Sequence, residues 1–112
     1  MKLTIEVLSQ TPGIFVHIDS ENLDAGNAKE FKEQILPHIN SNELVILDMG
    51  SLKFVDSSGL GALLSCLHAM NKKHGQLKLV NMNKSVIALF ELVRMHRIFS
   101  IYNTREEAIG SL

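Results

Sequence analysis

The segment Asp56-Ser57-Ser58-Gly59 places a carboxylate, two hydroxyls and a glycine between an apolar run and a long helical pattern. A serine hydroxyl in such a place can cap a helix, attack an electrophile or accept a phosphoryl group. Asp and Ser are both favoured helix caps, so capping is the simplest interpretation of this segment, called the DSSG segment below. One cap would suffice, however, and two hydroxyls follow Asp56.

Two glycines favour a binding role for the DSSG segment. Gly59 and Gly61 fall in the first turns of the predicted helix, where each costs about 0.5–1 kcal/mol relative to alanine. Glycines there leave the backbone open to a closely approaching partner. The segment is also expected at the C-terminal edge of a buried strand and at a helix N-terminus. Open α/β sheets place ligands at such edges, and helix N-termini offer unpaired N–H groups.

Catalysis by these serines and nucleotide binding are both poorly supported. The stretch VDSSG lacks the first glycine of the G-x-S-x-G nucleophile elbow, no S-x-x-K spacing begins at either serine, and no histidine is nearby in the sequence. The stretch GLG at 59–61 is not followed by the third glycine of the dinucleotide fingerprint. An esterase-like enzyme or a small-molecule binder at the same crevice stays open as an outside hypothesis.

Alternating strands and helices must position the DSSG segment. Apolar and polar residues alternate over 3–7 and again over 14–18, which predicts two strands joined as a hairpin by a turn at 10–13. The apolar run LVILDM at 44–49 predicts a strand covered on both faces. Two further strands are expected at 77–81 and 99–102.

Four helices are expected around these strands. Residues able to cap a helix stand before each one: Asp24 or Asn27, the DSSG segment, Asn83 and Thr104. Pro37 should end or kink the first helix. The order of elements predicts a single α/β domain over residues 1–112, with a mixed sheet of about four to five strands packed with about four helices.

The helix that follows the DSSG segment should reach about Lys73 and bury one apolar stripe. The stripe predicted from helical periodicity consists of Leu60, Leu63, Leu64, Leu67 and Met70. Cys66 lies off this stripe and is expected to be only partly covered.

Composition limits the classes of function. The chain has 112 residues and a net charge of −1 with no basic stripe, which disfavours direct binding of nucleic acid. Its single cysteine excludes an internal disulfide and fits a reducing compartment. No apolar run approaches the roughly 20 residues of a membrane span, so we expect a cytoplasmic protein without membrane insertion. The five histidines lack metal-ligand spacing and are expected at the surface or at a sheet edge, so no metal or cofactor is predicted.

The stretch FVDSSGLGALL resembles the phosphorylation-site signature of STAS-domain anti-sigma factor antagonists, the anti-anti-sigma factors of partner-switching systems. The hairpin, the pair Leu23-Asp24 before the first helix, the LVILDM strand and the D-S-S-G-L-G-x-L pattern occur in the family's order, so the resemblance covers nearly the whole chain. It implies that Ser57 is the phosphoacceptor and that Asp24 lies close to it and helps in partner contact. The other residues expected at the same partner surface are Asp56, Ser58, Gly59 and Gly61.

The same resemblance implies a mechanism. The unmodified protein would bind an anti-sigma factor that is itself a serine kinase of the GHKL type, and sigma factor would be released. Phosphorylation of Ser57 would end this binding, and a PP2C-like phosphatase would reverse the modification. The chain would then be a binding module rather than an enzyme, with a monomer favoured. The alternative is a constitutive STAS scaffold in a signalling assembly or a regulatory module of a transporter.

Overall fold

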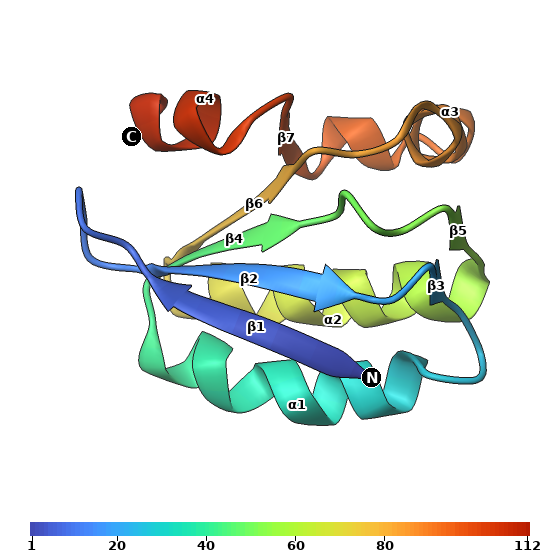
Figure 1. The fold of residues 1–112 in the computed structure, drawn as a ribbon, viewed down its shortest axis with the longest axis horizontal. Coiled ribbons are helices and arrows are strands. Elements are labelled where there is room, and N and C mark those ends of the chain that lie inside the picture. Colours follow the sequence, from blue (N-terminus) through green and yellow to red (C-terminus); the bar gives the residue numbers. More distant parts are fainter.

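The computed structural model describes residues 1–112 and is built on a five-stranded mixed sheet in the order β1-β2-β4-β6-β7 (Figure 1). Strand β1 runs antiparallel to β2, and all other neighbours are parallel. The strands are β1 (Lys2–Val7), β2 (Ile14–Asp19), β4 (Leu44–Asp48), β6 (Gln76–Val80) and β7 (Ser100–Tyr102). The predicted hairpin is confirmed, because β1 pairs directly with β2.

Four helices and a short 3₁₀ helix cover the two faces of this sheet (Figure 1). One face carries α1 (Ala28–Ser41) and α2 (Ser57–Lys72); the other carries α3 (Lys84–Leu92), the 3₁₀ helix η1 (Met95–Arg97) and α4 (Arg105–Gly110). Residues 44–47 of β4 are all buried, as predicted for a strand covered on both faces. The α/β class, the five-stranded mixed sheet and the four helices therefore confirm the predicted architecture.

A second, smaller sheet was not predicted from the sequence. Its strands, β3 (Asn22–Leu23) and β5 (Phe54–Val55), pair in parallel. Each has only two residues, which is too short to show an alternating pattern. The sequence placed both stretches in connections, and only their contact in space makes them strands.

The beginnings and ends of the helices correct three local predictions. Pro37 was predicted to end or kink the first helix; the helix continues through Pro37 to Ser41, so the first of these alternatives is wrong. Asn27 stands at the N-cap of α1 without capping it, since its amide group accepts from the backbone N–H of Asp24 at 3.0 Å. Asn83 likewise does not cap α3. Thr104 does cap α4, accepting from the backbone N–H of Glu107 at 3.1 Å as predicted.

The buried stripe of α2 differs from the predicted one. Leu63 and Met70 are fully buried, but Leu60, Leu64 and Leu67 are only partly buried. The buried residues of the helix are Gly59, Ala62, Leu63, Cys66 and Met70. Because α2 packs against both α1 and the sheet, small side chains at 62 and 66 permit close approach on this side, and the larger leucines lie towards the margin of the core.

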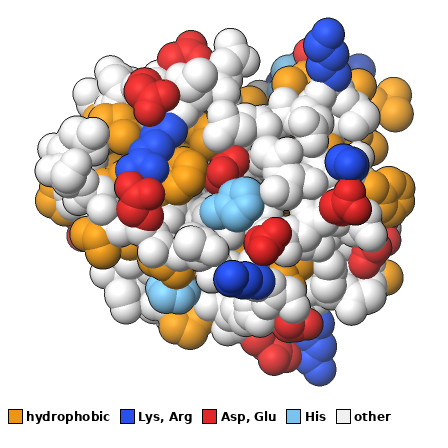
Figure 2. All heavy atoms as spheres, viewed as in Figure 1, with side chains coloured by type: hydrophobic (Ala, Val, Ile, Leu, Met, Phe, Trp, Pro, Cys, Tyr) orange, Lys and Arg blue, Asp and Glu red, His pale blue; other side chains and the backbone are white.

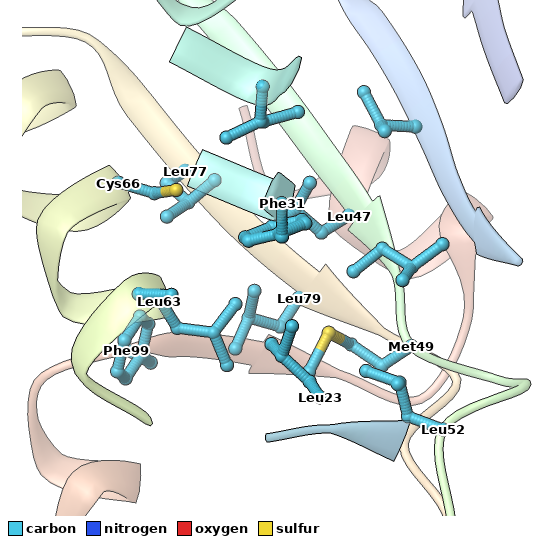
Figure 3. Close-up of a cluster of buried hydrophobic side chains, with 14 of the residues drawn as sticks. Leu23, Phe31, Leu47, Met49, Leu52, Leu63, Cys66, Leu77, Leu79 and Phe99 are labelled. Carbon is cyan, nitrogen blue, oxygen red and sulfur yellow. The ribbon is translucent and has the colours of Figure 1, made fainter. Parts of the chain in front are cut away.

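Cys66 is completely buried, so the prediction of partial cover is wrong. Cys66 and Leu63 extend from α2 into the cluster that also contains Leu77 and Leu79 of β6 (Figure 3). Burial raises the pKa of the Cys66 thiol to about 12, although the positive charge of Lys32 acts in the opposite direction. The thiol therefore stays protonated at neutral pH and inaccessible to reagents.

A thiol-reactive aromatic disulfide should accordingly fail to modify Cys66 in the native protein and modify it completely in denaturant. The thiolate is the nucleophile in this exchange, and native Cys66 lacks both the charge and the exposure that the reaction needs. Absorbance of the released thiolate measures the reaction, with Cys66→Ala as the blank. Rapid stoichiometric reaction of the folded protein would contradict the packing of α2 against the sheet.

The charges of the surface are dispersed. On the face shown in Figure 2, the Lys and Arg side chains lie singly among acidic and hydrophobic side chains and form no continuous basic area. Backbone phosphates of nucleic acids are bound by clustered basic side chains, and this face presents none. None of the helices combines the length and the apolar character needed to cross a membrane.

Candidate functional site

The small sheet positions the DSSG segment. Strand pairing sets Leu23 opposite Val55, and the backbone N–H of Asp56 donates to the carbonyl of Leu23 at 3.2 Å. The backbone N–H groups of Lys53 and Phe54 donate to the carbonyl of Glu21. The segment therefore follows β5 of the small sheet, whereas the sequence predicted that it lies at the C-terminal edge of a buried strand.

Asp56 is the residue that caps α2. Its Oδ1 accepts from the backbone N–H of Gly59 at 2.9 Å, and its Oδ2 accepts from the backbone N–H of Ala25 at 3.1 Å. The hydrogen bond from Gly59 lowers the pKa of Asp56; partial desolvation opposes this shift and the bond from Ala25 adds to it. The carboxylate is therefore held charged at neutral pH, at the positive end of a 16-residue helix.

Ser57 and Ser58 are exposed and do not supply the cap. They are the first two residues of α2, where backbone N–H groups have no partner within the helix. Within the DSSG segment, the capping role that the sequence suggested is therefore carried out by Asp56 alone. Both hydroxyls are left available at a helix N-terminus.

The two glycines have different surroundings. Gly59 is buried, and a Cβ there would lie 2.1 Å from the carbonyl oxygen of Leu23, so only glycine allows β3 to pack this closely against α2. Gly61 is exposed, and a Cβ added there would have nothing within 4 Å. Open backbone is therefore available at Gly61, while Gly59 contributes close packing beneath the segment.

Asp24 lies on the loop that contacts the DSSG segment. Its Oδ1 accepts from the backbone N–H of Gly26 at 2.9 Å, which shapes the turn leading into α1. The next residue, Ala25, donates to Asp56, so this loop and the helix N-terminus are joined directly. The structure thus brings the loop that carries Asp24 beside Asp56, at the end of the molecule where Ser57 and Ser58 are exposed.

Phe54 is a surface residue that was not predicted from the sequence. Its side chain is 53% exposed directly before the DSSG segment, whereas its neighbour Val55 is buried. A two-residue strand offers no alternation from which to predict this orientation. Phe54 therefore adds exposed apolar area directly before the charged and hydroxyl groups of the segment in the chain. Interfaces commonly combine these kinds of groups.

A second polar cluster, also missed, lies at the C-terminal ends of β2 and β4. Strand register sets His17 opposite Asp48, and His17 Nδ1 lies 2.8 Å from Asp48 Oδ2. Ser51 Oγ lies 3.3 Å from His17 Nε2. The sequence predicted only surface or edge histidines, but β2 is an interior strand and the side chain of His17 is one-third exposed. No spacing in the sequence could reveal this cluster, because the pairing of β2 with β4 creates it.

Neither group of residues lines a pocket. The single open pocket, of about 500 Å³, lies at the N-terminal ends of β2, β4 and β6, where Gly13, Leu44 and Gln76 line it. The predicted crevice for a ligand at the DSSG segment is therefore absent from this structure. Ser57 and Ser58 of the segment lie on exposed surface outside the pocket.

The fold and this exposed helix N-terminus correspond to a known class of domain. The sequence model described as the STAS domain matches residues 5–108 of the 112. The chain belongs to the STAS domain family.

Among its relatives are anti-sigma factor antagonists of similar length. The anti-sigma F factor antagonist of Paenibacillus polymyxa is 28% identical over 114 residues, covering 100% of this chain and 97% of the relative. The anti-sigma-B factor antagonist of Bacillus subtilis strain 168 is 26% identical over 101 residues, covering 90% of this chain and 92% of the relative.

The fold is also similar to that of the Bacillus anti-sigma factor antagonist SpoIIAA, which has been solved in two forms. The unphosphorylated form has a TM-score of 0.71 at 20% identity and covers 98% of this chain and 96% of its own. The phosphorylated form has a TM-score of 0.69 at 20% identity and covers 98% of both chains. At this identity the likeness establishes a shared fold.

Proposed function

We propose that this protein is an anti-sigma factor antagonist that works by partner switching, with Ser57 as its phosphoacceptor. The observation that carries the proposal is the capping of α2 by Asp56, which leaves the Ser57 hydroxyl exposed on a rigid helix N-terminus. Relatives named as anti-sigma factor antagonists match nearly the full chain. In this scheme the unphosphorylated form binds an anti-sigma factor and frees the sigma factor.

The position of Ser57 suits a reversible phosphate. Phosphorylation adds about −1.5 to −2 charges at neutral pH. Helix N-termini stabilise such groups through free N–H donors and the helix dipole, so the isolated domain should keep its fold. The charge can then act on the interface, where a neutral hydroxyl has been replaced by a near-dianion.

The partner surface we propose consists of exposed groups around this hydroxyl together with the half-buried Asp24. Ser58 and Gly61 lie on the first turns of α2, Asp24 lies on the adjoining loop, and Phe54 supplies an apolar contact. Asp56 and Gly59 act beneath them by fixing the helix against the loop. The partner is a GHKL-type serine kinase that also acts as the anti-sigma factor, and a PP2C-like phosphatase resets the switch.

The protein is then a substrate and a switch in this pathway, acting in the cytoplasm as a single-domain monomer. A constitutive STAS scaffold, in a signalling assembly or a transporter, would have the same fold but would not use phosphorylation. The exposed, uncommitted hydroxyl of Ser57 favours the switch.

Incubation with a GHKL-type anti-sigma kinase and ATP should place one phosphate on Ser57. Ser57→Ala should abolish incorporation, and Ser58→Ala, the matched control one residue further on, should retain it. Phosphopeptide mapping distinguishes the two positions. Phosphate on Ser58, with Ser57→Ala still modified, would overturn the assignment of Ser57. The scaffold would be favoured if the protein binds an anti-sigma kinase and frees its sigma factor but is never phosphorylated by that kinase.

A further inference from the structure

The cluster formed by His17, Asp48 and Ser51 has the order of contacts found in serine nucleophile sites. One ring nitrogen of His17 faces the carboxylate of Asp48 at 2.8 Å, and the other faces the hydroxyl oxygen of Ser51 at 3.3 Å. When Nδ1–H donates to the carboxylate, Nε2 is left as the acceptor for the Ser51 proton. This is the relation of base, orienting acid and hydroxyl that activates a serine.

The acid of this cluster is held firmly in place. Asp48 Oδ1 accepts from the side-chain amide of Asn81 at 3.0 Å and from the backbone N–H of Gly50 at 3.0 Å. Burial alone would raise the pKa of Asp48, but the hydrogen bonds from Asn81, His17 and Gly50 outweigh it, so the pKa is lowered. A carboxylate that stays ionised fixes the imidazole and stabilises the imidazolium formed during proton transfer.

We propose that Ser51 is a second reactive hydroxyl, activated by His17 and Asp48, and that it accepts an acyl group from activated esters. Ser51 Oγ attacks the carbonyl carbon while its proton passes to His17 Nε2. His17 Nε2 gives this proton to the oxygen of the leaving alcohol as its bond to the acyl carbon breaks, and an acyl-serine forms. Water then attacks the acyl carbon while the neutral His17 takes a proton from it. His17 returns that proton to Ser51 Oγ as the free acid leaves. This activity goes beyond partner switching, because Ser57 takes no part in it.

The surroundings of Ser51 define the expected substrates. The only pocket of the molecule lies at the other end of the parallel strands, so no cavity at Ser51 selects an acyl chain. The side chain of His17 is one-third exposed, which lets a small ester reach the base directly. The reaction should therefore be slow, unselective for chain length and limited to esters with good leaving groups, such as p-nitrophenyl acetate.

The test uses p-nitrophenyl acetate with the full chain at neutral pH. Release of p-nitrophenolate should exceed the buffer rate, and peptide mapping after acid quench should find the acetyl group on Ser51. Ser51→Ala should abolish that acetylation, and His17→Gln should slow it by roughly a hundredfold, as expected for loss of a general base. The controls are Ser9→Ala and His68→Gln, whose side chains are exposed and lie outside the cluster.

Three outcomes would overturn the proposal. They are an absence of acetyl-Ser51 in the wild-type protein, acetylation of Ser51 at the wild-type rate in His17→Gln, and an unchanged release rate in Ser51→Ala. Circular dichroism of each variant confirms that the fold is retained. Because Ser57 is intact in every variant, phosphorylation by the kinase provides an independent measure of the partner-switching proposal.

Discussion

Phosphorylation of Ser57 should lower the affinity for the anti-sigma partner by about a hundredfold or more. In an interface with an effective dielectric constant near 20, two unit charges about 5 Å apart repel by about 3 kcal/mol. Each 1.4 kcal/mol corresponds to a tenfold change in affinity. The near-dianion would face the acidic groups already present at this end of the molecule and the nucleotide phosphates of the kinase, whereas the unmodified hydroxyl is neutral.

Variants at Ser57 separate the effect of charge from the loss of the hydroxyl. Ser57→Ala should bind the partner like the unmodified protein, because no charge is added and Asp56 still caps the helix. Ser57→Asp should bind more weakly than Ser57→Ala but more tightly than the phosphorylated protein, because it adds a single charge. Titration of all forms against the same partner, with ATP and with ADP, measures these differences, and circular dichroism checks the fold.

The charge mechanism fails if both Ser57→Asp and the phosphorylated protein bind as tightly as the unmodified protein while folding normally. The constitutive scaffold would then replace the switch as the proposed function. In that case the DSSG segment would retain only its structural role, the capping of α2 by Asp56.

Gly59→Ala should be strongly destabilising, by about 1–3 kcal/mol or more, as expected for overpacking. The added Cβ would lie 2.1 Å from the carbonyl oxygen of Leu23 and 2.8 Å from its carbonyl carbon. These are backbone atoms, so the clash can be relieved only by moving β3 away from α2. That movement would also strain the hydrogen bond from Ala25 to Asp56, and partner binding should fall together with stability.

Gly61→Ala is the matched control for this prediction. Nothing lies within 4 Å of the new Cβ, and alanine in a helix is favoured over glycine by about 0.5–1 kcal/mol, so this variant should be more stable than the native protein. Urea unfolding followed by circular dichroism gives both free energies. Equal stability of Gly59→Ala and the native protein would show that β3 can move away from α2 at no cost.

The sequence alone determined the elements whose pattern extends over several residues. The alternation over 3–7 and 14–18 predicted the hairpin, and the apolar run at 44–49 predicted a strand covered on both faces; the structure confirms both. The start of α2 at the DSSG segment was also predicted, because a polar cap before a periodic apolar stretch is a local signal. The resemblance to STAS-domain proteins, carried by the DSSG segment, is confirmed by the family match.

Tertiary structure decided the features that depend on residues far apart in the chain. The pairing of β3 with β5 brings the loop of Asp24 to Asp56, and the close approach of β3 to α2 explains why residue 59 is a glycine. Neither two-residue strand has a sequence pattern of its own. Periodicity predicted that α2 is amphipathic but not how the helix is rotated about its own axis between α1 and the sheet. That rotation buries Cys66, which the sequence predicted to be only partly covered. The cluster of His17, Asp48 and Ser51 exists only because β2 pairs with β4 in one register. Sequence patterns report burial relative to near neighbours, while register and helix rotation are set by packing between distant segments.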